Sequence, residues 1–136
     1  MTPGARLLAV VEIINDIFLQ PIDDNFSSDK IIKNWIRNSR YAGSKDRKEI
    51  INNVFGIIKR YFSLDYIQKN NITLEKRSLE LAIIYFIFYG GGKNSLISRF
   101  NDGPYAIKMT DNINGYIEKI SAYNFNEIEF VKCALP

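Results

Sequence analysis

The chain contains no histidine and a single cysteine, Cys133, among its 136 residues. A disulfide within the chain needs two cysteines, and zinc sites depend mostly on cysteine and histidine, so the sequence excludes both. Histidine is also the side chain whose ordinary pKa suits proton transfer near neutral pH. Catalysis would therefore need a carboxylate or a lysine with a strongly shifted pKa, and the composition argues against a self-contained enzyme.

The chain also lacks a long apolar run. The most apolar stretch, Leu79–Tyr89, has 11 residues and includes Glu80, whereas a helix needs about 20 residues to span a membrane. The N-terminal apolar segment is interrupted by Glu12 and Asp16, and no small-residue cleavage site of the kind that ends a signal peptide follows it. We therefore expect a soluble, cytoplasmic protein with no membrane partner.

Apolar residues still make up 46% of the chain, which is enough for one domain with a single core. They recur at helical spacing, and no strand-like alternation extends beyond four residues. The predicted caps are Thr2, Ser28 or Asp29, Ser44, Thr73 and Thr110. The predicted helices cover about 3–20, 29–38, 45–62, 64–69, 74–89, 94–100 and 111–122.

This pattern predicts an all-α bundle of about six or seven helices in one domain. The helix over 74–89 is expected at the centre, because its second half is apolar nearly all round. Trp35 falls on the apolar stripe of its helix, so we assign it to the core. The segment GGGKNS (90–95) is interpreted as a helix stop, because Ile87 and Asn94 stand where a phosphate-binding loop needs glycine and a hydroxyl residue.

The charges are unevenly distributed. Between Lys30 and Arg60, nine basic residues accompany two acidic ones, a local charge of +7, whereas the rest of the chain has nine basic and 13 acidic residues, a charge of −4. The nine are Lys30, Lys33, Arg37, Arg40, Lys45, Arg47, Lys48, Lys59 and Arg60. Since the net charge is only +3, one strongly basic third indicates a local site for a polyanion.

The best candidates for this site surround the glycine turn at Gly43, between the second and third predicted helices. Lysine and arginine at phosphates release bound counterions, which supplies most of the affinity that does not depend on base sequence. A tyrosine beside them is suited to stack on an unpaired base. The predicted RNA-binding residues are Arg37, Arg40, Tyr41, Lys45, Arg47 and Lys48. No catalytic, metal-binding or cofactor-binding residue is predicted.

Two local features favour an anion at this turn. Backbone amides at the start of the helix after Ser44 point outward, and Gly43 allows the backbone to approach a ligand closely. The alternative is that the charges only solvate helix faces, while Asp46 or an arginine braces the turn. For any single residue the sequence leaves both interpretations open.

Three segments, in this order along the chain, carry a resemblance to a known family: MTPGARLLAVVEIINDIF (1–18), IIKNWIRNSRYAGSKDRKEIINNVFGIIKR (31–60) and RFNDGPYAIKMTDNINGYIEKI (99–120). They resemble the N-terminal region of the RsmB/Sun (NOP-type) ribosomal RNA cytosine-C5 methyltransferases, in the version common among alphaproteobacteria. That region has the helical fold of the antitermination factor NusB. The block RYAGSKDR (40–47) is the most specific part of the match.

The resemblance implies a NusB-like RNA-binding domain at residues 1–132 that positions ribosomal RNA for 5-methylcytosine formation. In such enzymes a linker and a catalytic domain that binds S-adenosylmethionine follow. Residues 133–136 correspond to the start of that linker, so we expect neither a catalytic half nor a cofactor in this chain. NusB-type folds also pair with themselves or with a small ribosomal protein, and a protein-interaction or antitermination-like module is the alternative function.

Overall fold

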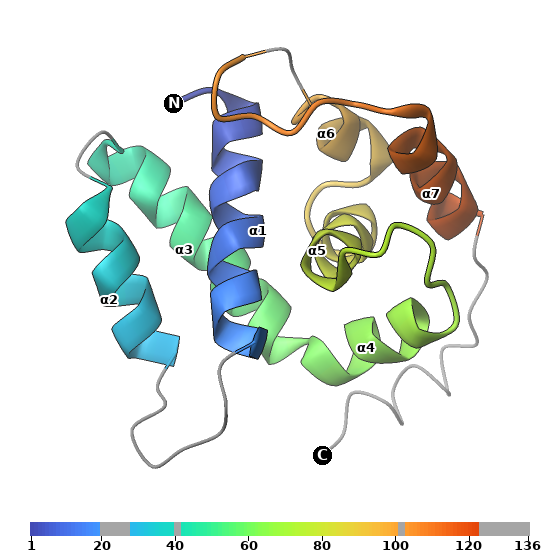
Figure 1. The fold of residues 1–136 in the computed structure, drawn as a ribbon, viewed down its shortest axis with the longest axis horizontal. Helices are drawn as coiled ribbons and strands as arrows, with labels where there is room; N and C mark the ends of the chain where they lie inside the picture. Colours follow the sequence, from blue (N-terminus) through green and yellow to red (C-terminus); the bar gives the residue numbers. More distant parts are fainter. Residues whose placement is uncertain (20–27, 40–41, 101–102, 123–136) are drawn as a thin grey trace.

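The computed structural model describes residues 1–19, 28–39, 42–100 and 103–122. Within them the chain forms seven α-helices and no strand (Figure 1), which confirms the predicted all-α class. The helices are α1 (Pro3–Leu19), α2 (Ser28–Asn38), α3 (Ser44–Lys59), α4 (Tyr61–Lys69), α5 (Arg77–Phe88), α6 (Lys93–Ile97) and α7 (Asp111–Ser121). None of these helices combines the length and the apolar character needed to cross a membrane.

Helix α5 forms the centre of the bundle. Its residues Ser78–Phe86 are all buried, and it contacts α1, α3, α4, α6 and α7. Figure 1 shows α5 nearly end-on, with α1 on one side and α7 on the other. The sequence pattern predicted this central position correctly, because a helix without a polar stripe must be covered on every side.

The start of α5 differs from the prediction. The helix begins at Arg77 and not directly after Thr73. The buried carboxylate of Glu80 accepts hydrogen bonds from the backbone amides of Thr73 and Leu74, at 2.8 and 3.1 Å. It also accepts one from the Gln68 side chain, at 3.0 Å. These hydrogen bonds hold the preceding segment as a loop against α5, and they satisfy a charge that would otherwise be costly to bury.

The break between the third and fourth helices lies earlier than predicted. The helix expected over 45–62 ends at Lys59, and α4, which was expected over 64–69, begins at Tyr61 after the non-helical residue Arg60, which has φ −107° and ψ 18°. The change of direction allows α4 to bury Leu64 in the core. Apolar spacing continues through the break, so the periodicity alone did not locate it.

Helices α1, α2 and α3 form the side of the bundle that carries the basic segment. Helix α1 contacts α2, α3 and α5. In α2 the fully buried residue is Ile32, while Trp35 and Ile36 are half-buried and pack against the core, in agreement with the assignment of Trp35. Because α2 covers α1 rather than α5, it lies at the outer edge of the molecule (Figure 1).

Local signals at two helix starts and one helix end are confirmed. Thr2 and Thr110 each accept a hydrogen bond from the backbone amide three residues later, at 3.0 and 3.1 Å. The glycines that open the segment 90–95 form the helix stop after α5, in which Gly91 and Gly92 have φ of +104° and +94°, while α6 already begins at Lys93. Glycine adopts this left-handed region without the steric cost that other residues incur.

Gly56 and Gly115 provide a matched test of the packing. A Cβ added at Gly56 in α3 would lie 2.8 Å from two ring carbons of Tyr85 in α5, whereas one added at Gly115 in α7 would meet nothing within 4 Å. We expect Gly56→Ala to lower the free energy of unfolding by about 1–3 kcal/mol, because the buried tyrosine must shift. Gly115→Ala should raise it by about 0.5–1 kcal/mol, because alanine favours the helix. Urea unfolding followed by circular dichroism measures both, and a stabilising Gly56→Ala would contradict this packing.

Candidate nucleic-acid interface

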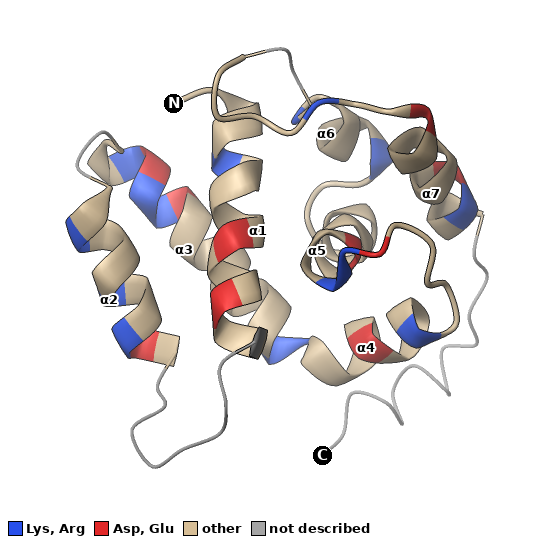
Figure 2. Cartoon of the chain, viewed as in Figure 1, with Lys and Arg blue, Asp and Glu red and all other residues tan. Residues whose placement is uncertain are grey.

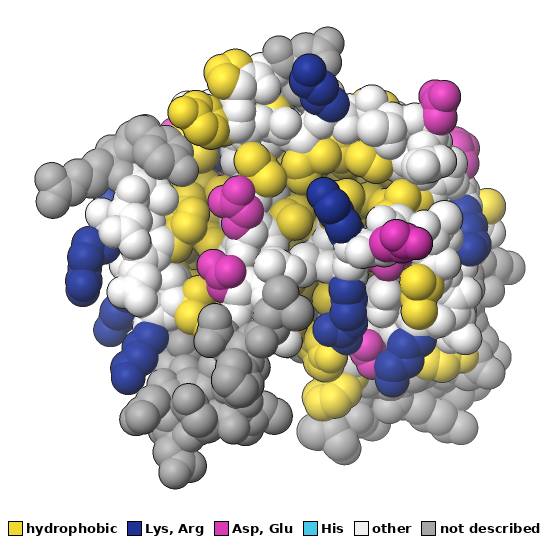
Figure 3. All heavy atoms as spheres, in the orientation of Figure 1, with side chains coloured by type: hydrophobic (Ala, Val, Ile, Leu, Met, Phe, Trp, Pro, Cys, Tyr) yellow, Lys and Arg dark blue, Asp and Glu magenta, His cyan; other side chains and the backbone are white. Residues whose placement is uncertain are grey.

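The outer face of α2 is basic. Lys30, Lys33 and Arg37 are exposed, and their spacing of three and four residues places them on one face of the helix. Ile32 and Trp35 belong to the opposite side, which packs against the core. Figure 2 shows the positions of the basic residues of α2 in blue along its ribbon, and Figure 3 shows basic side chains along the same outer edge of the molecule. Arg37, the predicted RNA contact in this row, therefore faces solvent.

A second basic group occupies the first two turns of α3. Lys45 and Lys48 are exposed, and Arg47 is half-buried. The predicted cap at Ser44 is wrong, because Ser44 is the first residue of α3 and Gly43 takes the cap position without a side-chain hydrogen bond to the helix. Gly43 has φ −66°, a conformation that any residue adopts. The first amides of α3 thus lack a capping side chain, which favours an anion beside them.

The two carboxylates of the basic segment are paired with cations from outside it. Arg6 of α1 lies between them: its Nη1 is 3.2 Å from Asp46 Oδ1, and its Nε is 2.6 Å from Glu49 Oε2. The amine of Met1 lies 3.5 Å from Asp46 Oδ2. Arg99, which follows α6, places its Nη1 3.2 Å from Glu49 Oε1. We call these five groups the Arg6 network.

The Arg6 network changes the electrostatics of the surface. Asp46 and Glu49 directly follow Lys45 and Lys48 in the sequence, so they are the acids best placed to neutralise the start of α3. Both carboxylates instead form ion pairs with cations of the Arg6 network. The ion pairs of the described residues include none of Arg37, Lys45, Arg47 and Lys48. No carboxylate of the described residues is therefore paired with these four cations.

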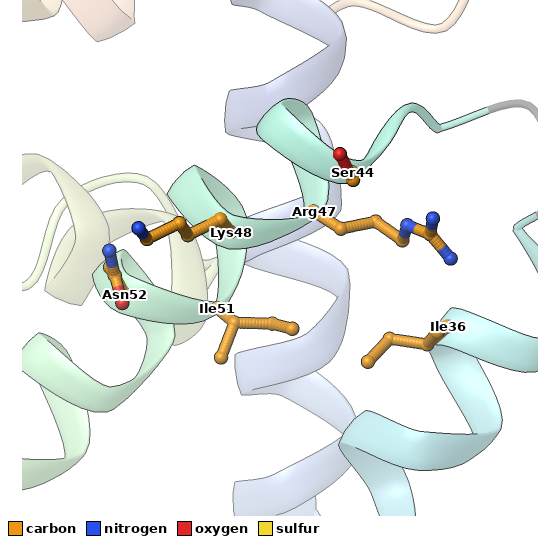
Figure 4. Close-up of a pocket in the computed structure, with 6 residues that line it drawn as sticks. All are labelled: Ile36, Ser44, Arg47, Lys48, Ile51 and Asn52. Carbon is orange, nitrogen blue, oxygen red and sulfur yellow. The ribbon is translucent and has the colours of Figure 1, made fainter.

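A groove lies between α2 and α3 beside these cations. Its volume is about 360 Å³, and it is lined by Ile36, Ser44, Arg47, Lys48, Ile51 and Asn52. Figure 4 shows Ile36 of α2 and Ile51 of α3 directed into the space between the two helices. Arg47 extends above them toward α2, whereas Lys48 and Asn52 project on the side away from α2. The groove thus combines an apolar floor with a polar and cationic rim.

The structure brings together part of the predicted set. Arg47 and Lys48 line the same groove, and Arg37 and Lys45 lie exposed on the two helices that border it. The sequence did not select the other lining residues as part of the site: Ile36, Ser44, Ile51 and Asn52. Among these, Asn52 is the one whose position the sequence pattern could have indicated. It shares one helical face with Lys48, at a spacing of four residues, so periodicity offered a signal.

Of the other residues of the basic third, two are described away from this site, and one lies outside the described residues. Arg40 and Tyr41, both predicted to bind RNA, lie outside the described residues. Lys59 and Arg60 follow at the opposite end of α3, about 20 Å along the helix axis from its start. The Arg60 guanidinium lies 4.6 Å from the centre of the Tyr89 ring. The positive charge of α3 and of Arg60 after it is therefore divided between the two ends of the helix. The candidate site lies at the N-terminal end.

Neither a metal centre nor a known relative identifies the site. In the part of the chain that the structure describes, no three metal-ligating side chains form a group that could hold an ion. Comparison of the chain with protein-family models, curated proteins and solved structures gives no match. The interpretation of the site thus depends on its charges, its groove and the sequence segments quoted above.

Removal of Arg6 tests the Arg6 network. We expect Arg6→Met to lower the free energy of unfolding by about 1–2 kcal/mol in low salt, because two partly buried carboxylates lose a hydrogen-bonded cation. The loss should shrink in about 1 M NaCl, which screens charges beyond about 3 Å. The control is Lys119→Met, which removes an exposed cation with one long contact to Thr73 and should change stability by less than about 0.5 kcal/mol. Equal effects of the two substitutions in chemical denaturation would disprove the role of the network.

Proposed function

We propose that this chain is an RNA-binding domain, with a binding surface formed by α2 and the start of α3. The proposal depends on one observation: the cations of this segment are separated from the acids that could neutralise them. Arg37, Lys45, Arg47 and Lys48 are exposed or half-buried and take part in none of the ion pairs of the described residues. The two acids of the same segment are held by arginines from other parts of the chain.

A phosphate backbone is the polyanion that suits this surface best. The cations are distributed along one face of α2 and around the first turns of α3, and they do not converge on one point as they would around a small anion. A chain of phosphates can contact such a row in succession, with each contact releasing counterions. The uncapped amides of α3 add a further favourable position for one phosphate.

The family resemblance supports RNA over other polyanions. Under this proposal the domain holds structured ribosomal RNA so that a methyltransferase domain with S-adenosylmethionine can reach its cytosine. Arg40 and Tyr41 take part through their place in the RYAGSKDR block. The chain described here supplies binding and orientation, and the methyl transfer itself belongs to the catalytic domain of such enzymes.

Charge removal at the groove tests the proposal. The variant Arg47→Gln plus Lys48→Gln should bind a ribosomal RNA hairpin roughly tenfold or more weakly at about 50 mM salt. It should also reduce the slope of log K against log salt by about 1.5, because each phosphate contact contributes about 0.7–0.9 to that slope. Fluorescence anisotropy titrations at several salt concentrations measure both quantities.

The matched control removes the same charge elsewhere. Lys108→Gln plus Lys119→Gln alters two exposed lysines, one just before α7 and one within it, on the other side of α5 from α2. This variant should keep the affinity and the salt slope of the parent chain within about twofold, because distant surface charges are screened. If both double variants lose affinity equally, RNA attraction is a property of net charge and the site assignment is wrong.

A second surface favours the alternative, a protein-interaction module. Figure 3 shows an apolar hollow between α1 and the loop before α5. It has a volume of about 490 Å³ and is lined in part by Leu8, Val11 and Leu79. Glu12 also lines it, and burial together with the nearby Asp16 raises the pKa of this carboxyl group. A hollow of this kind suits apolar side chains of a partner.

Sedimentation velocity at two salt concentrations separates the two functions. A protein-interaction module that pairs with itself should associate in a salt-insensitive way, and Val11→Lys should prevent the association by placing a charge in the apolar hollow. RNA binding, in contrast, should be salt-sensitive and unaffected by Val11→Lys. Self-association together with RNA affinity that Arg47 and Lys48 do not influence would favour the protein-interaction function.

A further inference from the structure

We propose that the groove between α2 and α3 receives the base of one unpaired nucleotide, while Arg47 and Lys48 hold the phosphates on either side of it. This inference rests on the proposed function and goes beyond it, because it names the form of RNA that the surface selects. A surface that contacts only phosphates binds paired and unpaired RNA with similar affinity. A surface with a pocket for a base prefers RNA with an unpaired nucleotide.

The floor of the groove supports a base as its occupant. Ile36 and Ile51 approach from two different helices and leave an apolar space between them (Figure 4). Paired bases in a duplex are stacked and expose only their edges, so a duplex cannot use such a floor. An unpaired base can leave the stack and place its flat face against apolar side chains. The floor lies beside Arg47 and Lys48, which form no ion pair with another described residue, and this position fits a ligand that joins an apolar ring to charged groups.

The rim of the groove supplies the polar contacts that a base and its phosphates need. The Ser44 hydroxyl and the Asn52 amide each offer a donor and an acceptor, which match the edge of a base. Arg47 extends over the groove toward α2, and its planar guanidinium can bind one phosphate through two hydrogen bonds. Among the described residues that line the groove none is acidic, which favours a phosphate there.

The size of the groove limits the ligand to one nucleotide. Its volume of about 360 Å³ is near the lower end of the range of about 300–1,000 Å³ for small-molecule sites. A peptide helix docked in a groove needs apolar anchors over several turns. Here the apolar floor consists of two isoleucines, which matches a single ring system better than a helix.

The test uses RNA hairpins that carry the same phosphates but differ in one base. The first has a single unpaired adenosine, the second has an abasic residue at that position, and the third is fully paired. We expect the parent chain to bind the adenosine hairpin about five- to tenfold more tightly than the abasic one, which corresponds to the weaker end of the stacking effect of one base. Fluorescence anisotropy at a fixed salt concentration measures all three affinities.

A variant that removes a polar contact to the base provides the second comparison. Asn52→Leu removes the rim amide that would contact the edge of the base without changing charge, and Asn52 is exposed, so the fold should tolerate it. This variant should lose the preference for adenosine over the abasic residue but keep its affinity for the abasic hairpin. Asn114→Leu, at an exposed position of α7, is the matched control and should keep the preference.

The outcomes distinguish the two proposals. Equal affinity of the parent chain for the adenosine and abasic hairpins overturns the base pocket and leaves RNA binding intact. A preference that survives Asn52→Leu also overturns the pocket, because the base then binds elsewhere. Failure to bind any of the three hairpins overturns the proposed function together with the inference.

Discussion

Five of the other six described helices are placed by the need to cover α5. Nine consecutive residues of α5, Ser78–Phe86, are withdrawn from water, and α1, α3, α4, α6 and α7 supply the cover. Helix α2 packs against α1 instead and therefore keeps a wide outer face. The exposure of Lys30, Lys33 and Arg37 on that face follows from the arrangement of the core, since a helix on the outside of the bundle buries a single stripe.

Helix α5 also connects the core to the charged surface. Arg99 lies with its guanidinium 4.5 Å from the centre of the Phe86 ring in α5, and it pairs with Glu49 at the same time. Arg6 extends the connection from α1 to Glu49 and Asp46. The carboxylates of α3 are thereby held toward α1 and the end of α6. This half-buried network has an electrostatic consequence, because each acid that it holds is one fewer counter-charge for the lysines and arginine at the start of α3.

Local signals predicted some elements closely and others poorly. The start of α7 was predicted well, because Thr110 caps it through a neighbouring amide. The break between α3 and α4 was predicted a few residues too late, because its position at Arg60 depends on contacts such as the one between the rings of Phe18 and Tyr61, whose centres are 4.8 Å apart. The late start of α5 was missed for a similar reason, since the Glu80 carboxylate competes with the helix for backbone amides of the preceding loop.

Composition, periodicity and caps, all read along the chain, were enough to establish the all-α class, the central position of α5 and the presence of one strongly basic third. These properties depend on residues within a few turns of each other, so a single sequence contains them. Only the folded chain determined which cations share a surface, which acids pair with which cations and where a groove lies. Those properties depend on pairs such as Arg6 and Asp46, which are 40 positions apart, and no local pattern specifies a contact over that distance.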